Sequence, residues 1–242
     1  DRKNPENYRP ISLTSCFGKI FERMVGKRLS WYLEENNSLS KFQSGFRKNH
    51  TTFDHIIRLE TDIRKGFKYK KHTTSVFLDI SKAYDMVYRP ALIFKLHEMG
   101  FRGHLAYYLL GFLSGRRSFQ VRYRSLHSHT HWFENGLPQG SCLSPMLFNI
   151  MINDIFDTAP PGINYSIFAD DCAIWCTDSD SQYSVTRLQQ ALYKVEEWSR
   201  KNGFIFSPTK SAVMTFTKNT RMHQISDLRL SGNIIPHVDS FK

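Results

Sequence analysis

Three aspartates of this 242-residue chain have the residue type and setting that phosphoryl-transfer chemistry requires. Asp170 and Asp171 are adjacent and stand between two apolar runs, 165–169 and 172–176. Such a pattern predicts a β-hairpin with both acids in its tight turn. Turn chemistry alone would also explain aspartate at these positions. Two carboxylates beside apolar strands repel each other, however, and a divalent cation would convert that repulsion into attraction.

Asp79 is the third acid, and it lies near the end of an apolar run, 73–80, that predicts another strand. A lone Asp at a strand end is usually a helix cap, but an uncompensated charge there is costly. Together with the adjacent pair it offers three hard oxygen ligands from two strand ends. That set suits two Mg²⁺ ions about 4 Å apart, which would stabilise the attacking and leaving oxygens of an in-line displacement.

The elements that must position these acids follow from periodicity and from capping residues. Apolar side chains such as Ile20, Met24, Leu29 and Leu33 predict an inward helix face, with Glu22 among the charges opposite. Gly66 is expected to end the second helix. Helices are predicted over 15–33, 51–65, 90–99, 104–113, 144–156 and 184–201, and further strands over 118–123, 129–133 and 213–216. This mixture of helices and antiparallel hairpins predicts the α+β class.

The charge balance favours a polyanionic partner. Lys and Arg number 33 against 22 Asp and Glu, a net charge of +11, which suits nucleic acid. Two basic runs are either solvated faces or tracks for phosphates: Lys65, Lys68, Lys70 and Lys71, and Arg116, Arg117, Arg122 and Arg124. No apolar run reaches the roughly 18 residues of a membrane span, so no membrane is expected as a partner.

Cysteines and histidines give no strong metal signal. The four cysteines (Cys16, Cys142, Cys172 and Cys176) match no zinc spacing and are expected to be reduced, packed thiols of an intracellular protein, nuclear or cytoplasmic. His127, His129 and His131 alternate along a predicted strand, where three imidazoles can hold a transition metal. Exposed strand residues are the favoured interpretation, because no fourth ligand is evident.

A series of motifs then covers nearly the whole chain in a fixed order: Tyr8-Arg-Pro-Ile-Ser-Leu13, Lys19-Ile-Phe-Glu-Arg23, Gln43-Ser-Gly-Phe-Arg47, Phe77-Leu-Asp-Ile-Ser-Lys-Ala-Tyr-Asp85, Gly136-Leu-Pro-Gln-Gly-Ser-Cys-Leu-Ser-Pro-Met-Leu-Phe148, Phe168-Ala-Asp-Asp171, and Trp198 through Ser207-Pro-Thr-Lys210. In these motifs the chain resembles the reverse transcriptase domain of a non-LTR (LINE-type) retrotransposon. The resemblance implies a right-hand polymerase fold with an antiparallel palm sheet backed by helices. Residues 1–72 would be mainly fingers and 73–242 mainly palm with some fingers elements. The thumb would be missing, as from a fragment of a longer polyprotein that also carries an endonuclease.

The resemblance also implies a metal site. Asp79, Asp170 and Asp171 would hold two Mg²⁺ ions, with Mn²⁺ as an alternative, and the backbone carbonyl of Ile80 would add a ligand. Asp85 is a weaker candidate, for which a structural hydrogen bond is expected. The family pattern is broken at Tyr88-Arg89-Pro90, which bears on helix packing more than on metals.

Five more residues are candidates for contact with substrate. Tyr84 would pack under the incoming sugar and exclude a 2′-OH, unless it is a core aromatic. Arg47 would grip the triphosphate, unless it is a surface residue. The amide of Gln139 would touch the nucleotide and Gly140 would let the template approach, unless the two form a plain turn. Lys210 would protonate the leaving pyrophosphate as general acid, unless it is a surface lysine.

These assignments predict an RNA-directed DNA polymerase that extends a primer 3′-OH with dNTPs on an RNA template, in retrotransposon replication. Its expected partners are the RNA template, the DNA primer and dNTPs. A group II intron-type reverse transcriptase or maturase is the close alternative. The alternative from another functional class is a non-catalytic, nucleic-acid-binding relic of the domain. All the predicted catalytic residues are intact in this chain, which argues against that alternative.

Overall fold

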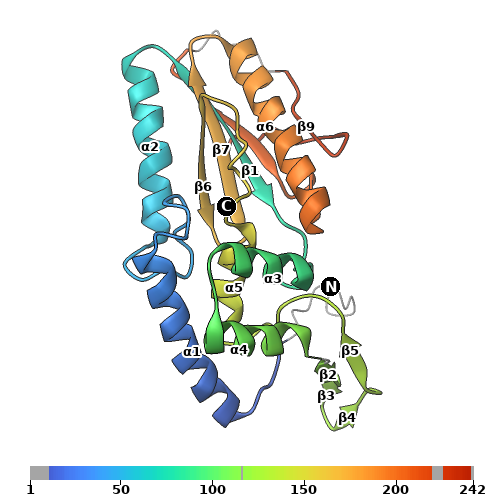
Figure 1. Ribbon diagram of the computed structural model, residues 1–242. Coiled ribbons are helices and arrows are strands. Elements are labelled where there is room, and N and C mark those ends of the chain that lie inside the picture. Colours follow the sequence, from blue (N-terminus) through green and yellow to red (C-terminus); the bar gives the residue numbers. More distant parts are fainter. Residues whose placement is uncertain (1–10, 116, 220–225, 241–242) are drawn as a thin grey trace. The chain divides into compact units, whose positions relative to one another are not determined.

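The computed structural model describes residues 11–115, 117–219 and 226–240 (Figure 1). Tyr8–Pro10 of the first motif and Arg116 of the second basic run lie outside these ranges. The chain forms two compact units, and it enters each of them twice. One comprises the described residues up to Ser38 together with Tyr84–Met151, and the other comprises Leu39–Ala83 together with the described residues from Ile152 onward. Within the described ranges, no helix is long and apolar enough to cross a membrane.

The second unit is built on a four-stranded antiparallel sheet. Its strands are β1 (His72–Asp79), β6 (Ile163–Phe168), β7 (Asp171–Asp178) and β8 (Ala212–Phe216), in the order β6-β7-β1-β8. The predicted strands therefore form close to their expected bounds, and with the helices they confirm the mixed class of helix and antiparallel sheet. The strands' β-branched and aromatic residues are mostly buried, which explains why their pattern was readable.

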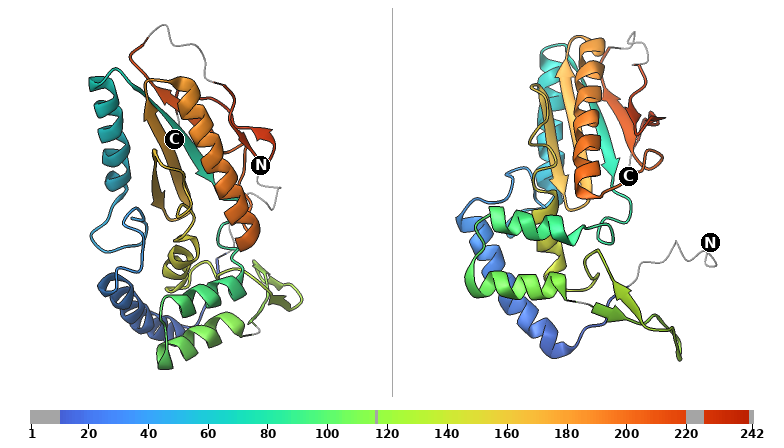
Figure 2. Two further views of the ribbon diagram at one scale, coloured as in Figure 1. Left: turned by 45° about the horizontal axis from the view of Figure 1, so that its top comes forward. Right: turned by 45° about the vertical axis from the view of Figure 1, so that its right-hand side comes forward.

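Helices α2 (Thr52–Lys68) and α6 (Ser181–Asn202) contact opposite faces of this sheet (Figure 2). Gly66 of α2 lies over Thr73 and Thr177, whereas Ser184 of α6 lies 3.4 Å from the imidazole of His72. Neighbouring residues of a strand face opposite sides, so the two helices enclose the sheet between them.

The prediction that Gly66 ends its helix is wrong. Gly66 is buried, and a Cβ there would lie 3.0 Å from the side chain of Thr177. Glycine is therefore required for close packing of helix on sheet, not for termination. The start of α2 is as expected, because Thr51 forms a capping box with Asp54. The backbone hydrogen bond from Thr51 is the main cause that lowers the pKa of the Asp54 carboxyl.

In the second unit, α6 has a glycine cap at its C-terminus and is contacted by a short hairpin. Gly203 follows this helix with a φ of 75°, as a left-handed C-terminal cap requires. A short hairpin, β9 (Arg229–Leu230) with β10 (Asn233–Ile234), contacts α6 through Gln189, whose amide bonds the N–H and C=O of Arg229.

The first unit contains α1 (Cys16–Glu35), α3 (Arg89–Glu98), α4 (Gly103–Ser114) and α5 (Ser144–Ile152), with α5 shorter than predicted. The predicted inward face of α1 is only partly right. Leu29 and Leu33 are buried, but Ile20 and Met24 are more than half exposed. Glu22, predicted on the solvent face, is buried instead. Periodicity identified the helix correctly but not the full orientation of its first half.

A two-stranded ribbon follows α4, and its pairing differs from the single ladder that was predicted. β2 (Arg117–Phe119) pairs with β5 (His131–Phe133), and β3 (Arg122–Tyr123) pairs with β4 (Leu126–His127). The registers of the two ladders differ by one residue, so the alternation of the three histidines is broken. All three histidines are exposed, as the favoured interpretation expected.

Candidate functional site

Two of the three predicted acids lie directly opposite each other in the sheet. Asp79, the last residue of β1, pairs with Asp171, the first residue of β7. Both side chains belong to the sheet face that also carries Thr73 and Thr177, because residues two apart share a face. Like charges at opposed positions are destabilising. The register therefore creates the electrostatic demand for a cation that the sequence suggested.

The third acid lies in the turn between β6 and β7. Phe168 pairs with Asp171, which leaves Ala169 and Asp170 as the two turn residues. The prediction that both acids lie in the turn is thus half right, since Asp171 already belongs to β7. Ala169 has a φ of 55°, the left-handed region that L-residues rarely adopt.

The backbone of Asp79 is tied to a loop that precedes β8. Its carbonyl accepts a hydrogen bond from Ser207 N at 2.9 Å, and its N–H donates to Ser211 Oγ at 3.2 Å. Both backbone groups of Asp79 therefore point away from β7, so Asp79 and Asp171 form a non-hydrogen-bonded pair. In such pairs the Cα atoms are about 4.5 Å apart and the side chains are closest.

The orientation of Ile80 follows from the same alternation. Ile80 forms an isolated antiparallel bridge with Phe206. The hydrogen bonds of this bridge are made by the residues on either side of Ile80: Asp79 O accepts from Ser207 N, and Ser81 N donates to Ile205 O at 2.9 Å. The N–H and C=O of Ile80 therefore point to the opposite edge, which is the side of β7. A carbonyl with this orientation is compatible with the ligand role that the resemblance implied.

Lys210 lies on the loop that is tied to Asp79. Ser211 Oγ, which accepts from Asp79, donates to Ser207 O at 2.7 Å and so closes this loop. Lys210 itself is exposed. Lys210 therefore directly precedes Ser211, the residue that bonds the backbone of Asp79, a predicted catalytic aspartate.

A second loop holds the turn that carries Asp170. Gln43 is fully buried, and its Oε1 accepts hydrogen bonds from Gly45 N at 2.7 Å and Ala169 N at 3.2 Å. A Cβ on Gly45 would lie 2.3 Å from Ala169 N, so only glycine fits. Sequence analysis quoted Gln43 within a motif but assigned it no role. The detectable signal was an amide two residues before a glycine in a short loop.

Arg47 belongs to this same loop and bonds to its backbone. One guanidinium nitrogen, Nη1, donates to Ser40 O and to Gln43 O, each at 2.9 Å. The side chain is half-buried. Arg47 therefore shapes the loop that supports the Asp170 turn, a role that the triphosphate prediction did not include.

The other predicted substrate residues gather in the first unit. The ring of Tyr84 stacks on Phe148, with centroids 5.0 Å apart and planes at 12°. Its carbonyl accepts from Leu137 N at 2.8 Å, which joins the segment after β1 to the loop 136–140. Across the same junction, Gln139 Nε2 donates to Asp85 Oδ1 at 3.3 Å. Asp85 thus makes the structural hydrogen bond that was expected of it.

The loop 136–141 is fixed from two further sides. Gly140 has a φ of 104°, and a Cβ there would lie 3.1 Å from Ser12 O. Arg89, at the departure from the family pattern, is buried and donates from Nε to Gly136 O at 2.9 Å. The departure therefore concerns packing, as expected, and it supports the loop that carries Gln139.

Glu22 is the functional-site residue that sequence analysis placed wrongly. Its buried carboxylate accepts from Ser141 Oγ at 2.6 Å and from Cys142 N at 2.8 Å. Charge-assisted bonds of this kind are about twice as strong as neutral ones. They fasten the loop after Gly140 to α1. The partners are 119 and 120 residues away in sequence, so no local pattern could reveal them.

Cys172 is buried and directly follows the two hairpin aspartates. Burial raises the pKa of the Cys172 thiol, and the neighbouring charges of Asp171 and Asp170 raise it further. All four cysteines are free; Cys172 and Cys176 are buried, as expected of packed thiols, whereas Cys16 is exposed, so the packing prediction is wrong for Cys16. In the described ranges, no three His, Cys, Asp or Glu side chains already form a group that could hold a metal ion.

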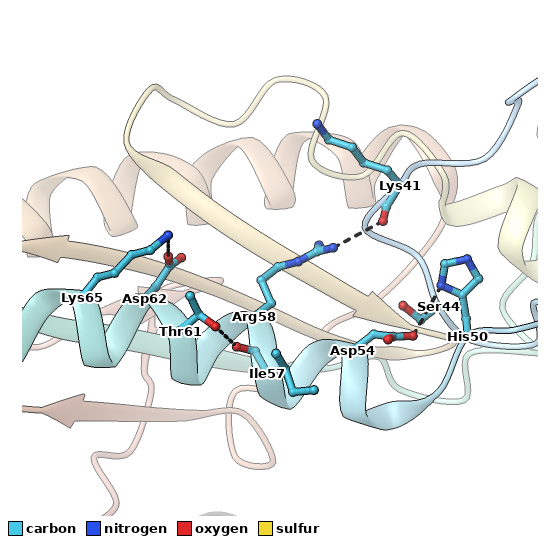
Figure 3. Close-up of a pocket in the computed structure, with 9 residues that line it drawn as sticks. All are labelled: Lys41, Ser44, His50, Asp54, Ile57, Arg58, Thr61, Asp62 and Lys65. Atoms are coloured by element: carbon cyan, nitrogen blue, oxygen red, sulfur yellow. Dashed lines mark hydrogen bonds and ion pairs between the residues drawn. The ribbon is translucent and has the colours of Figure 1, made fainter.

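A hollow of about 430 Å³ beside α2 is separate from these residues (Figure 3). Its nine lining residues are Lys41, Ser44, His50, Asp54, Ile57, Arg58, Thr61, Asp62 and Lys65. Along it, Lys65 lies 4.0 Å from the carboxylate of Asp62, and the imidazole of His50 lies 3.4 Å from that of Asp54. None of the predicted catalytic residues lines it.

Comparison with known proteins identifies the class that this sheet and its acids define. The chain matches the family described as reverse transcriptase (RNA-dependent DNA polymerase) over residues 2–233, and it belongs to that family. Within the family it is of the LINE type, as its similarity to retrotransposon proteins indicates. It is 30% identical to a probable RNA-directed DNA polymerase from transposon BS of Drosophila melanogaster, covering 96% of this chain and 26% of that protein. It is 29% identical to the RNA-directed DNA polymerase from mobile element jockey of Drosophila funebris, covering 98% and 26%.

Solved structures agree on the fold. A telomerase from Candida tropicalis, truncated from its C-terminal domain, aligns with a TM-score of 0.59 at 13% identity, covering 86% of this chain and 42% of that one. A telomerase from Candida albicans aligns with a TM-score of 0.56 at 14% identity, covering 90% and 37%. This chain spans about a quarter of the length of the retrotransposon relatives described above.

Proposed function

We propose that this chain carries the catalytic residues of an RNA-directed DNA polymerase that extends a primer 3′-OH with dNTPs on an RNA template, in retrotransposon replication. The observation that carries the proposal is the register that sets Asp79 opposite Asp171, with Asp170 in the adjoining turn. Family membership supports this interpretation. Because the chain spans a quarter of its relatives' length, the activity is proposed for the whole protein that contains it.

The donor set fits divalent cations. Asp79, Asp170 and Asp171, with the carbonyl of Ile80, would supply hard oxygen ligands, which Mg²⁺ and Mn²⁺ prefer. The bound ions would supply charge stabilisation for the phosphoryl group that is transferred. The bonds that the Asp79 backbone makes to Ser207 and Ser211 would fix Asp79 at its end of the sheet, opposite Asp171.

The remaining residues would bind and orient the substrates. Tyr84, held by its stack on Phe148, would pack against the incoming sugar and exclude a 2′-OH. Gln139 and Gly140 would contact the nucleotide and the template. Arg47 would bind the triphosphate through its guanidinium, whose planar fork of donors matches phosphate oxygens. Lys210 would donate the proton to the leaving pyrophosphate.

In this interpretation the chain is a right-hand polymerase with fingers and palm. The four-stranded sheet with α2 and α6 corresponds to the palm sheet backed by helices. The proposed fingers comprise mainly residues 1–72, apart from α2, which packs on the sheet. The grip on the product duplex is proposed to come from segments outside this chain.

Primer extension by the full-length protein on poly(rA)/oligo(dT), with and without Mg²⁺, tests the proposal. Asp170→Asn is expected to lower the rate on the order of 10³-fold, because several kcal/mol of charge stabilisation would be lost. Asp227→Asn, a change of the same type at an exposed position, is the matched control and should extend primers normally. Extension by Asp170→Asn at the wild-type rate would refute the metal assignment. No extension by the wild-type protein would favour the non-catalytic relic.

A further inference from the structure

The ribbon formed by residues 117–133, here called the basic ribbon, exposes apolar side chains that no layer covers. Val121 is 58% exposed, Tyr123 69%, Leu126 71% and Trp132 60%. The ladder β3–β4 consists of exposed residues on both faces. Two-stranded hairpins are marginal in water unless something packs on them. Tyr123 and Leu126 pair directly across this ladder, and adjoining exposed apolar residues indicate an interaction surface.

The charge of the ribbon determines what kind of partner it fits. Arginines occupy positions 117, 122 and 124, whereas residues 115–133 contain no Asp or Glu. Arg122 and Arg124 are exposed, and the guanidinium of Arg124 lies 5.5 Å from the ring centroid of Tyr123. Arg124 also has a φ of 56°, so the turn itself carries a cation at the end of the ribbon. The partner must therefore be anionic.

The aromatic residues restrict the partner further. Tyr123 lies next to the exposed arginines of the turn. Trp132 follows His131, and the ring centroids of His131 and Phe119 are 5.6 Å apart. Exposed rings between cations are the combination that binds unpaired nucleic acid, in which the phosphates meet arginines and the bases stack on aromatics. An acidic lipid surface would also accept cations together with interfacial Tyr and Trp, so binding to anionic vesicles is the competing outcome of the test.

We propose that the basic ribbon is a binding arm for single-stranded RNA, distinct from the loops that hold the catalytic aspartates. This inference rests on the proposed function, in which unpaired RNA is the template. The arm would hold template through stacking on Tyr123 and Trp132 and through phosphate contacts to Arg122 and Arg124. It would contribute to RNA affinity and leave the chemical step unchanged.

The test measures binding of a fluorescent single-stranded RNA to the full-length protein by anisotropy, without dNTPs or Mg²⁺, over a range of salt concentrations. The variant Arg122→Gln with Arg124→Gln is expected to reduce the slope of log K against log salt by about 1.4, from about 0.7 for each phosphate contact. Trp132→Leu is expected to weaken binding roughly 5- to 150-fold, and Trp132→Phe, which keeps a stacking ring, much less.

The matched control is Lys194→Gln with Arg200→Gln, which removes the same charge from exposed positions on α6. Equal loss of affinity in the control and in the ribbon variant would overturn the proposal, because only net charge would then matter. Preference of the ribbon for double-stranded RNA or for anionic lipid vesicles would also overturn it. The binding assay requires no catalysis, so the two proposals can fail separately. A protein that does not extend primers but still shows ribbon-dependent RNA affinity would refute the polymerase function and support the binding arm.

Discussion

Replacement of Gln43 by methionine tests how the protein holds its acidic turn. Gln43 is fully buried, and its Oε1 is the acceptor for two buried backbone N–H groups, those of Gly45 and Ala169. Methionine has nearly the same volume, so the cavity term is small. The substitution therefore removes the acceptor with little change in packing, directly beside Asp170.

The expected cost follows from the groups left without a partner. Two buried N–H groups without an acceptor cost about 1–3 kcal/mol each. The amide Nε2 of Gln43 has no hydrogen-bond partner among the described residues, and its removal returns about 1–3 kcal/mol. The free energy of unfolding should therefore fall by roughly 1–3 kcal/mol. Ala169 would lose the bond that offsets its left-handed φ, so the turn would relax and displace Asp170.

Urea unfolding and primer extension measure the two consequences. We expect kcat to fall on the order of tenfold, since about 1.4 kcal/mol of misplacement has that effect. Gln189→Met is the matched control, because Gln189 also makes two backbone bonds, to Arg229, at a partly exposed position where water replaces them. If Gln43→Met matched Gln189→Met in both stability and kcat, the amide would not hold the turn.

Three further predictions concern other parts of the site. Glu22→Ala should lower the free energy of unfolding by about 2–4 kcal/mol, because the buried groups of the loop 141–142 lose a charged acceptor; an unchanged urea midpoint would contradict this. Tyr84→Ala should admit ribonucleotides whereas Tyr84→Phe should not, and unaltered selectivity of the alanine variant in primer extension would remove the sugar gate. Burial, with a smaller contribution from the charge of Arg58, lowers the pKa of His55 to about 4. Stability should therefore be complete above pH 6.5 and decline as the pH falls toward 4, because the unfolded state binds the proton first. His55→Asn should flatten that decline between pH 6.5 and 5 in urea titrations, and an unchanged slope would exclude His55 as its source.

The elements around the acids were predictable because their signals are local. The run 73–80 and the two halves of the Asp170 hairpin have strand composition, and the strands β1, β6 and β7 formed where expected. The predicted start at 51 and end at 201 lie close to the observed ends, where Thr51 caps α2 and Gly203 follows α6, because capping chemistry involves only neighbouring residues. Gly66 failed as a stop signal because its small size serves a contact with the sheet, which local composition does not encode.

The sequence by itself determined which residues can do the chemistry. Asp79, Asp170 and Asp171, the order of the motifs and the basic composition identified the family, because residue type and spacing are written directly in the chain. The roles of Tyr84 and Lys210 stay predictions.

Only the tertiary structure decided how these residues are held. The register of β1 against β7 sets Asp79 opposite Asp171, Gln43 supports the turn, and Glu22 is buried rather than exposed. Each of these facts depends on hydrogen bonds or pairing between residues roughly a hundred positions apart. Such contacts form only when the strands and helices pack, so no periodicity along the chain can specify them.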